Sequence, residues 1–324
     1  MSKILGKSEI TARRIPFPET VLEFQRWFPD EESCIDYLHQ SRWPEGFVCP
    51  KCGSRRGASR IEAYRRIECA ECKHQTSVTA GTVMHGTRMP LRVWFNGAYL
   101  VTTHTPGLSA LQFQRQLGIR TYETAFQMLH KLRSAMVRPD RDRIHGIVEV
   151  DDTFIGAKKP GKRGRGAAGK VMVAGAIEVL KWEEQKERAG RLRLQVVADG
   201  SAASLVGFVV DNVEAGSFVK TDRLISYSKL EQKGYTYRMV ETRELEHIHK
   251  AFGNLKTWLE GTHHGVSNKH MQAYLNEFVF RHNRRRTPMA AFQTVLGLAT
   301  RTKGPTYDEL YSAGPSATWN HPNS

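Results

Sequence analysis

Two adjacent carboxylates, Asp151 and Asp152, stand inside the stretch IVEVDDTFIG, residues 147–156. The alternation in I-V-E-V predicts a β-strand that ends at the aspartates. Adjacent negative charges repel each other, so a cationic partner is expected. A second acid, Asp222, follows another short apolar stretch, SFVKT. Carboxylates that converge from the ends of neighbouring strands predict a site for a hard cation such as Mg²⁺ or Mn²⁺.

Such a site suits the chemistry of phosphodiesters. Two ions roughly 3.5–4 Å apart stabilise both the attacking and the leaving oxygen of an in-line displacement. The structural alternative for an isolated strand-end acid is the capping of a turn. Strand parity groups Asp151 with Glu149 and Asp152 with Val150, which by itself does not choose the functional acid.

A third ligand is expected on a helix, and the candidate is predicted near residues 244–260. Asn254 lies on it and offers a neutral carbonyl oxygen. His247 lies seven residues earlier, on the same face of the helix. From chemistry alone, a solvated surface amide is the stronger interpretation of Asn254.

Four of the five cysteines form two CxxC pairs separated by sixteen residues. Each pair can bring two sulfurs to one ion, and two pairs complete a tetrahedral shell of thiolates. We therefore expect a structural zinc ion held by Cys49, Cys52, Cys69 and Cys72. The alternative, a pair of disulfides, is typical of secreted proteins. The remaining Cys34 is expected to be a buried apolar residue.

The chain is strongly basic, with 48 Lys and Arg against 33 Asp and Glu, a net charge of +15 and a pI near 9.7. Such a field attracts polyanions, of which nucleic acid is the favoured one. The loop KKPGKRGRGAAGK, residues 158–170, carries six cations and no acid, and RHNRRR spans 281–286. We interpret them as a mobile arm and a clamp on the DNA backbone, with a solvated hairpin and a solvated helix end as alternatives. The expected DNA contacts are Lys158, Lys159, Lys162, Arg163, Arg165, Arg284, Arg285 and Arg286.

The stretch LSALQFQRQLGIRTYETAFQMLHKL, residues 108–132, is typical of a helix-turn-helix. Gly118 suits the turn and Thr121 can cap the second helix. A plain helical hairpin is the alternative. The expected recognition face carries Tyr122, Glu123, Gln127 and Lys131.

The rest of the chain sets the frame for these sites. Short helices are predicted over 21–28 and 33–43, and strands alternate with helices from residue 146 onward. The chain lacks an apolar run long enough to span a membrane and an apolar signal-peptide core, so a cytoplasmic protein without a membrane partner is expected. The tail over 301–324 is rich in Pro, Gly and Ser, and we expect it to be flexible.

Five segments follow one another along the chain: CPKC…CAEC, VEVDDTFIG, KTDRLISY, GNLKTWLEGTHHGV and KHMQAYLNEFVFRHNRR. In the order of these segments the chain resembles the bacterial insertion-sequence transposases with an N-terminal zinc ribbon and a DD[E/N] catalytic domain. The resemblance covers roughly residues 25–295. It implies an α/β, RNase H-like mixed sheet flanked by helices, preceded by a zinc ribbon and a helix-turn-helix-like region. It assigns the catalytic, metal-binding positions to Asp151, Asp222 and Asn254.

Three residues stand out against this pattern. Asp152 replaces a more usual Glu, and Arg223 stands where Gly is expected; neither change removes a ligand. Glu277 is a rival third acid, which we expect instead to brace its helix or to pair with the basic run. We expect the following domains: a zinc ribbon over 15–88, a helix-turn-helix-like region over 89–142, a catalytic domain over 145–300 and a flexible tail over 301–324.

The implied activity is DNA transposition with two Mg²⁺ or Mn²⁺ ions. The protein would bind element ends, cut the strand there and let the freed 3′-hydroxyl attack target DNA. Double-stranded DNA is then the partner, and cutting two ends together implies a homo-oligomer on DNA. Two alternatives remain: a catalytically inactive zinc-ribbon DNA-binding regulator, and a structure-selective nuclease without strand transfer.

Overall fold

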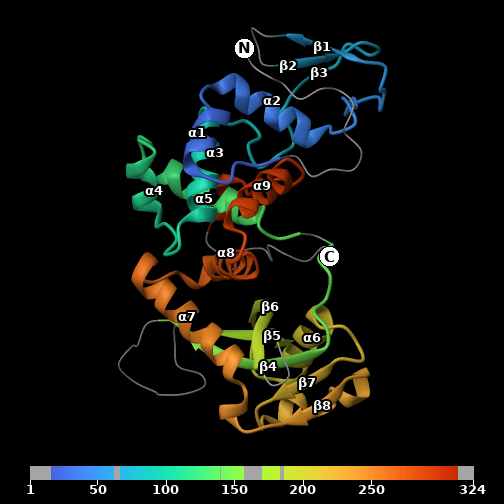
Figure 1. The fold of residues 1–324 in the computed structure, drawn as a ribbon, viewed down its shortest axis with the longest axis vertical. Helices are drawn as coiled ribbons and strands as arrows, with labels where there is room; N and C mark the ends of the chain where they lie inside the picture. Colours follow the sequence, from blue (N-terminus) through green and yellow to red (C-terminus); the bar gives the residue numbers. More distant parts are fainter. Residues whose placement is uncertain (1–15, 62–65, 139, 157–169, 183–185, 313–324) are drawn as a thin grey trace.

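The computed structural model describes residues 16–61, 66–138, 140–156, 170–182 and 186–312 (Figure 1). An upper body holds helices and a small sheet, and a larger sheet lies below it. The elements of the upper body that come first in the chain are α1 (Val21–Trp27), α2 (Glu31–Arg42), β1 (Ala58–Ile61), β2 (Arg66–Cys69), β3 (Gln75–Ser77), α3 (Leu91–Thr103), α4 (Ala110–Gln116) and α5 (Tyr122–Ser134).

The lower body is a five-stranded mixed sheet. Its elements are β4 (Ile147–Ile155), β5 (Val171–Trp182), β6 (Lys186–Val197), α6 (Ala202–Asn212), β7 (Phe218–Thr221), β8 (Thr236–Met239), α7 (Glu246–His263) and α8 (Met271–Asn283). The strand order is β6-β5-β4-β7-β8. Strands β4, β5 and β6 pair antiparallel, whereas β7 and β8 continue the sheet parallel to β4.

Helices cover both faces of this sheet, because the side chains of its strands alternate between two cores. Val171, Val173 and Ile177 of β5 pack with α7 and α8. Met172 and Ala174, between them, pack with α6. The expected α/β mixed sheet flanked by helices is therefore confirmed.

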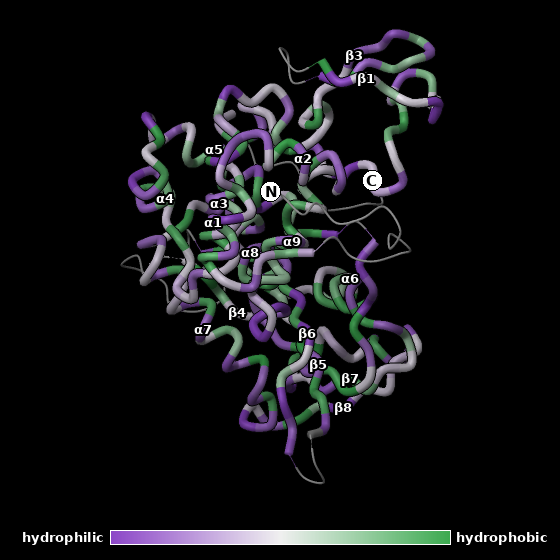
Figure 2. Tube along the Cα trace, turned by 45° about the horizontal axis from the view of Figure 1, so that its top comes forward, coloured by the Kyte–Doolittle hydropathy of each residue, from purple (hydrophilic) through white to green (hydrophobic). Residues whose placement is uncertain are grey.

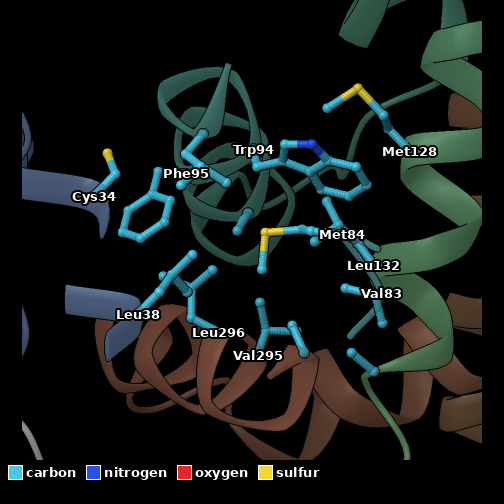
Figure 3. Close-up of a cluster of buried hydrophobic side chains, with 14 of the residues drawn as sticks. Cys34, Leu38, Val83, Met84, Trp94, Phe95, Met128, Leu132, Val295 and Leu296 are labelled. Carbon is cyan, nitrogen blue, oxygen red and sulfur yellow. The ribbon is translucent and has the colours of Figure 1, made fainter. Parts of the chain in front are cut away.

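The upper body has one core that also takes in α9 (Pro288–Ala299). Phe292, Val295, Leu296 and Ala299 recur at helical spacing and are buried against α2 and α3 (Figure 3). Figure 1 shows α9 among the first helices rather than beside the sheet. The sequence predicts a catalytic domain that extends to residue 300. In the structure, α9 packs in the core of the upper body instead, because its apolar stripe completes that core.

The chain after α9 is also part of the described fold. Residues Tyr307–Tyr311 form the short helix α10, which starts at a capping box between Thr306 and Glu309. Leu310 is only 2% exposed. The sequence predicted a flexible tail over 301–324 from composition, but one buried leucine and two capping hydrogen bonds hold its first part; residues 313–324 lie outside the described chain.

An ion pair joins the two bodies. Arg133 of α5 donates from Nε to Oε2 of Glu277 in α8 at 2.7 Å, and both side chains are buried. The Arg133 guanidinium also lies 3.9 Å from the ring centre of Tyr274. Arg281 lies 3.6 Å from the same carboxylate. Glu277 therefore braces the helix and pairs with the basic run, as the sequence suggested.

Candidate active site and metal centres

Asp151 is a buried carboxylate in the middle of the large sheet. Strand β4 does not end at the aspartates, because it continues beside β5 to Ile155. Its parallel pairing with β7, however, ends at Val150 and Thr221. The next residue on each strand is an aspartate, Asp151 and Asp222. Neighbouring strands lie about 4.8 Å apart, so the two acids lie side by side where β7 ends.

The face on which Asp151 lies is the one covered by α7. Glu149, two residues earlier on the same face, accepts a hydrogen bond from the backbone N–H of Ile248 at 2.9 Å. His249, the next residue of the helix, lies with Nε2 2.8 Å from Oδ2 of Asp151. The backbone N–H of Asp152 donates to Oδ1 of Asp151 at 2.8 Å. Both oxygens of Asp151 are therefore held in place.

The electrostatics of the site favour a bound cation. Burial raises the pKa of Asp151, and the nearby charge of Asp222 raises it further, while the bonds from Asp152 and His249 act in the opposite direction. Burial also raises the pKa of Glu149, against the hydrogen bond from Ile248. A metal ion beside these carboxylates would relieve the repulsion, because it stabilises their charged forms.

Asp222 is half-buried at the end of β7, as the sequence predicted for its strand. Its Oδ1 accepts a hydrogen bond from the backbone N–H of Leu224 at 3.1 Å, which fixes the turn after the strand. The neighbouring Arg223 forms an exposed ion pair with Glu241.

Asn254 lies on α7 but is exposed. It follows His249 by five residues, which is a rotation of roughly 140° about the helix axis. Lys256, seven residues after His249, returns to the same face and donates from Nζ to Oγ1 of Thr153 at 2.7 Å. The structure therefore brings His249 and Lys256, and not Asn254, to β4.

The sequence interpretation missed His249, although a signal was present. His249 and Lys256 stand seven apart, the same spacing that drew attention to His247 and Asn254. Only the packing of α7 shows which of these faces meets the strand. Leu255 and Leu259 are buried against the sheet and set that rotation.

The four cysteines of the predicted zinc site converge. Their sulfurs all lie within 4.8 Å of one another, and in the described chain no other group of three or more Cys, His, Asp or Glu residues is gathered as tightly. Cys49 lies 3.6 Å from Cys72, and Cys52 lies 3.8 Å from Cys69. Four thiolates at 2.3 Å from a zinc ion would be about 3.8 Å apart. The donor set thus fits a structural Zn²⁺. The fifth cysteine, Cys34, is fully buried as expected.

The predicted DNA-contacting residues fall into two groups. Lys158, Lys159, Lys162, Arg163 and Arg165 lie outside the described residues. In the second group, Arg284 stacks 4.0 Å from the ring centre of Phe280, and Arg285 donates to the carbonyl of Ala189. Arg286 is exposed. Part of this basic run therefore supports the fold, and Arg286 presents its charge outward.

The helix-turn-helix region folds as α4, a turn and α5. Gly118 adopts φ +62° in that turn, and Oγ1 of Thr121 accepts the hydrogen bond from the N–H of Thr124 that caps α5. Both local predictions are confirmed. None of the described helices is both long and apolar enough to cross a membrane.

Two stretches of the chain match known protein families. Residues 143–283 match the ISXO2-like transposase domain, and residues 29–75 match the transposase zinc-ribbon domain. A relative from Halobacterium salinarum, described as an uncharacterized protein in transposable element ISH50, is 25% identical over 294 residues. That alignment covers 84% of this chain and 98% of the relative.

Proposed function

Because the chain carries a transposase zinc ribbon and an ISXO2-like transposase domain, we propose that it is the DNA transposase of an insertion sequence. It binds the ends of the element, cleaves the DNA strand there and joins the freed 3′-hydroxyl to target DNA. The reaction is an in-line phosphoryl transfer that depends on divalent metal ions and needs no covalent enzyme intermediate.

The observation that carries this proposal is the pair Asp151 and Asp222, the first on β4 and the second directly after the neighbouring parallel strand β7. Their oxygens are the donors that Mg²⁺ and Mn²⁺ prefer. Asp151 is 9% exposed and held from two sides, whereas Asp222 is half-buried at the strand end. When bound, two such ions supply an activated water and stabilise the charge on the reacting phosphate.

We propose that His249, rather than Asn254, is the residue of α7 that supports the metal site, since the Nε2–Oδ2 contact joins His249 directly to Asp151. His249 orients that carboxylate toward the ion, in the way that outer groups commonly fix metal ligands. Lys256, on the same face of α7, offers its ammonium group to the phosphate of the bound strand.

Double-stranded DNA is the proposed partner, both as element end and as target. The zinc ribbon, with its structural zinc ion, and the helical region would hold the end, while Arg286 and the basic arm of residues 158–170 would contact phosphates. Because two ends must be cut together, we propose a homo-oligomer on DNA.

The test is cleavage of a labelled duplex that carries the terminal repeat bordering the gene, with Mg²⁺ or Mn²⁺. Wild-type protein should leave a 3′-hydroxyl at the repeat end, and Asp151→Ala and Asp222→Ala should leave the duplex intact. Tight binding without any cut by the wild-type protein, in either metal, would refute the enzyme and leave a DNA-binding regulator. Cutting of branched DNA regardless of the terminal sequence would indicate a nuclease.

A second comparison separates the two candidates for the third position. His249→Ala should lower the cleavage rate about 10–100-fold, the usual effect of losing a group that orients a metal ligand. Asn254→Ala, on the exposed side of the same helix, should cleave within about twofold of wild type. The opposite result would assign the third ligand to Asn254, as the resemblance implies.

A further inference from the structure

The helix that the sequence selects for base reading, α5, is enclosed along most of its length. Met128, Leu129 and Leu132 are buried in the upper core. Arg133 is committed to the ion pair with Glu277 of α8. A helix packed on these sides cannot enter a DNA groove with its middle or its C-terminal half.

The outer side of α5 is also contacted by the chain that follows α9, although Tyr122 and Glu123 in its first turn remain exposed. The rings of Phe126 and Tyr311 lie 6.0 Å apart. Interaction with the carboxylate of Glu123 raises the pKa of the Tyr307 hydroxyl. A Cβ built on Gly304 would stand 3.0 Å from Cγ of Lys131. Glu123 and Lys131, two residues of the expected recognition face, therefore contact the segment 304–311 of the same chain.

The first helix of the motif, α4, has a free face instead. Ala110 and Phe113 turn into the core. Figures 1 and 2 both place α4 at the outer edge of the upper body. Its exposed residues are one and four positions apart in the sequence, so they lie on one side of the helix. They are Leu111, Gln112, Arg115 and Gln116.

These side chains are of the types that read bases in the major groove. Arginine pairs with the two acceptors of guanine, glutamine with the acceptor and donor of adenine, and an apolar side chain with the methyl group of thymine. No acidic residue occurs between Glu71 and Glu123 in the sequence, so no carboxylate of this stretch repels a phosphate. Arg120 is exposed in the turn that follows, where its charge can meet the backbone.

We propose that α4, with the turn to α5, is the surface that reads the base sequence of duplex DNA in the major groove. A helix about 10–12 Å across fits that groove, which is about 12 Å wide. Helix α5 packs beneath this surface, and α10 packs against α5 and stabilises its position. The inference rests on the proposed function in one respect, since it assumes that the chain recognises a particular DNA sequence.

The experiment selects preferred sequences from a library of random duplexes, without added Mg²⁺ or Mn²⁺ and with the zinc-loaded protein. Every protein carries Asp151→Ala, so that binding is measured without cleavage. The test variant is Gln112→Ala/Arg115→Ala/Gln116→Ala, and the matched control on α5 is Gln127→Ala/Lys131→Ala. Zinc content and thermal unfolding confirm that both variants fold.

The parent protein and the α5 control should enrich the same motif. The α4 variant should lose about tenfold or more of that enrichment, because each base-specific pair contributes a large share of discrimination. It should keep its binding to unrelated duplexes. Loss of the motif in the α5 control together with its retention in the α4 variant would overturn the inference, as would a parent protein that enriches no motif.

These outcomes are separate from those of the cleavage test. A protein that enriches a motif through α4 but cuts no DNA supports the reading surface and refutes the transposase activity. A protein that cuts element ends while its α4 variant selects the unchanged motif retains the activity and refutes the reading surface.

Discussion

At the scale of single residues, the buried charge of Asp151 lowers the stability of the fold at neutral pH. Its carboxylate is buried beside Asp222, and its pKa is raised by burial and by that neighbouring charge. A raised pKa means that the folded protein binds the proton more tightly than the unfolded chain does. The resulting stability is present below the unfolded pKa and is lost as the pH rises through the folded pKa.

Asp151→Asn should therefore stabilise the metal-free protein at neutral pH while it abolishes cleavage. The amide keeps the shape of the carboxylate and removes its charge, and the gain in the free energy of unfolding should be roughly 1 kcal/mol. Thermal unfolding in the presence of a chelator, at pH 5 and pH 7.5, measures it. The difference between wild type and variant should be larger at the higher pH.

Asp211→Asn serves as the control, because Asp211 is exposed on α6. It should change the unfolding temperature little at either pH. A variant at Asp151 that is less stable than wild type at neutral pH would show that the carboxylate supports the fold, and would contradict the cost assigned to its buried charge.

At the scale of elements, the zinc ribbon should depend on all four of its cysteine sulfurs. Cys69→Ser should release the zinc ion and unfold β1 to β3, because structural zinc contributes directly to the folding of such small domains. Metal analysis measures the zinc content, and limited proteolysis locates the loosened segment.

The fifth cysteine provides a matched control for that experiment. Cys34 is fully buried in the core of the upper body and is not one of the four sulfurs that converge. Cys34→Ala should keep one zinc ion per chain. Equal zinc content in Cys69→Ser and in wild type would refute the four-sulfur site.

The contact between α5 and α8 is a second test at this scale. Glu277→Gln or Arg133→Met should each destabilise the protein by about 3–5 kcal/mol, because each leaves a buried charge without its partner. The double variant Arg133→Met/Glu277→Gln should cost less than the sum of the two single changes. Chemical denaturation measures all three. Strict additivity would contradict the pairing.

At the scale of the whole molecule, the charge of +15 should dominate non-specific DNA binding. Binding to an unrelated duplex should weaken linearly on a plot of log K against log salt concentration, with a slope of about −0.9 for each phosphate contacted. Arg286→Ala should reduce the size of that slope by about one. Fluorescence anisotropy at several salt concentrations measures it.

Arg26 on α1 is an exposed arginine of the other body and makes a suitable control. Arg26→Ala should leave the slope within error of wild type. An unchanged slope in Arg286→Ala would indicate that the basic run serves the fold alone, in line with the packing of Arg284 on Phe280.

The sequence by itself determined the features that depend on near neighbours. The CxxC spacing identified the zinc ligands, since two residues are the gap that lets both sulfurs reach one ion. Gly118 and Thr121 identified the turn and the cap of α5, because both effects act within a few residues. The alternation of strands with helices predicted an α/β fold, and the mixed sheet was implied by the resemblance to insertion-sequence transposases.

The tertiary structure decided the features that depend on how elements turn and meet. His249 rather than Asn254 contacts Asp151 because buried leucines set the rotation of α7. In the same way, the apolar stripe of α9 found its partners in the first core rather than in the sheet. Helical periodicity shows that a helix has several faces, but only packing against distant parts of the chain decides which face meets the active site, the core or the solvent.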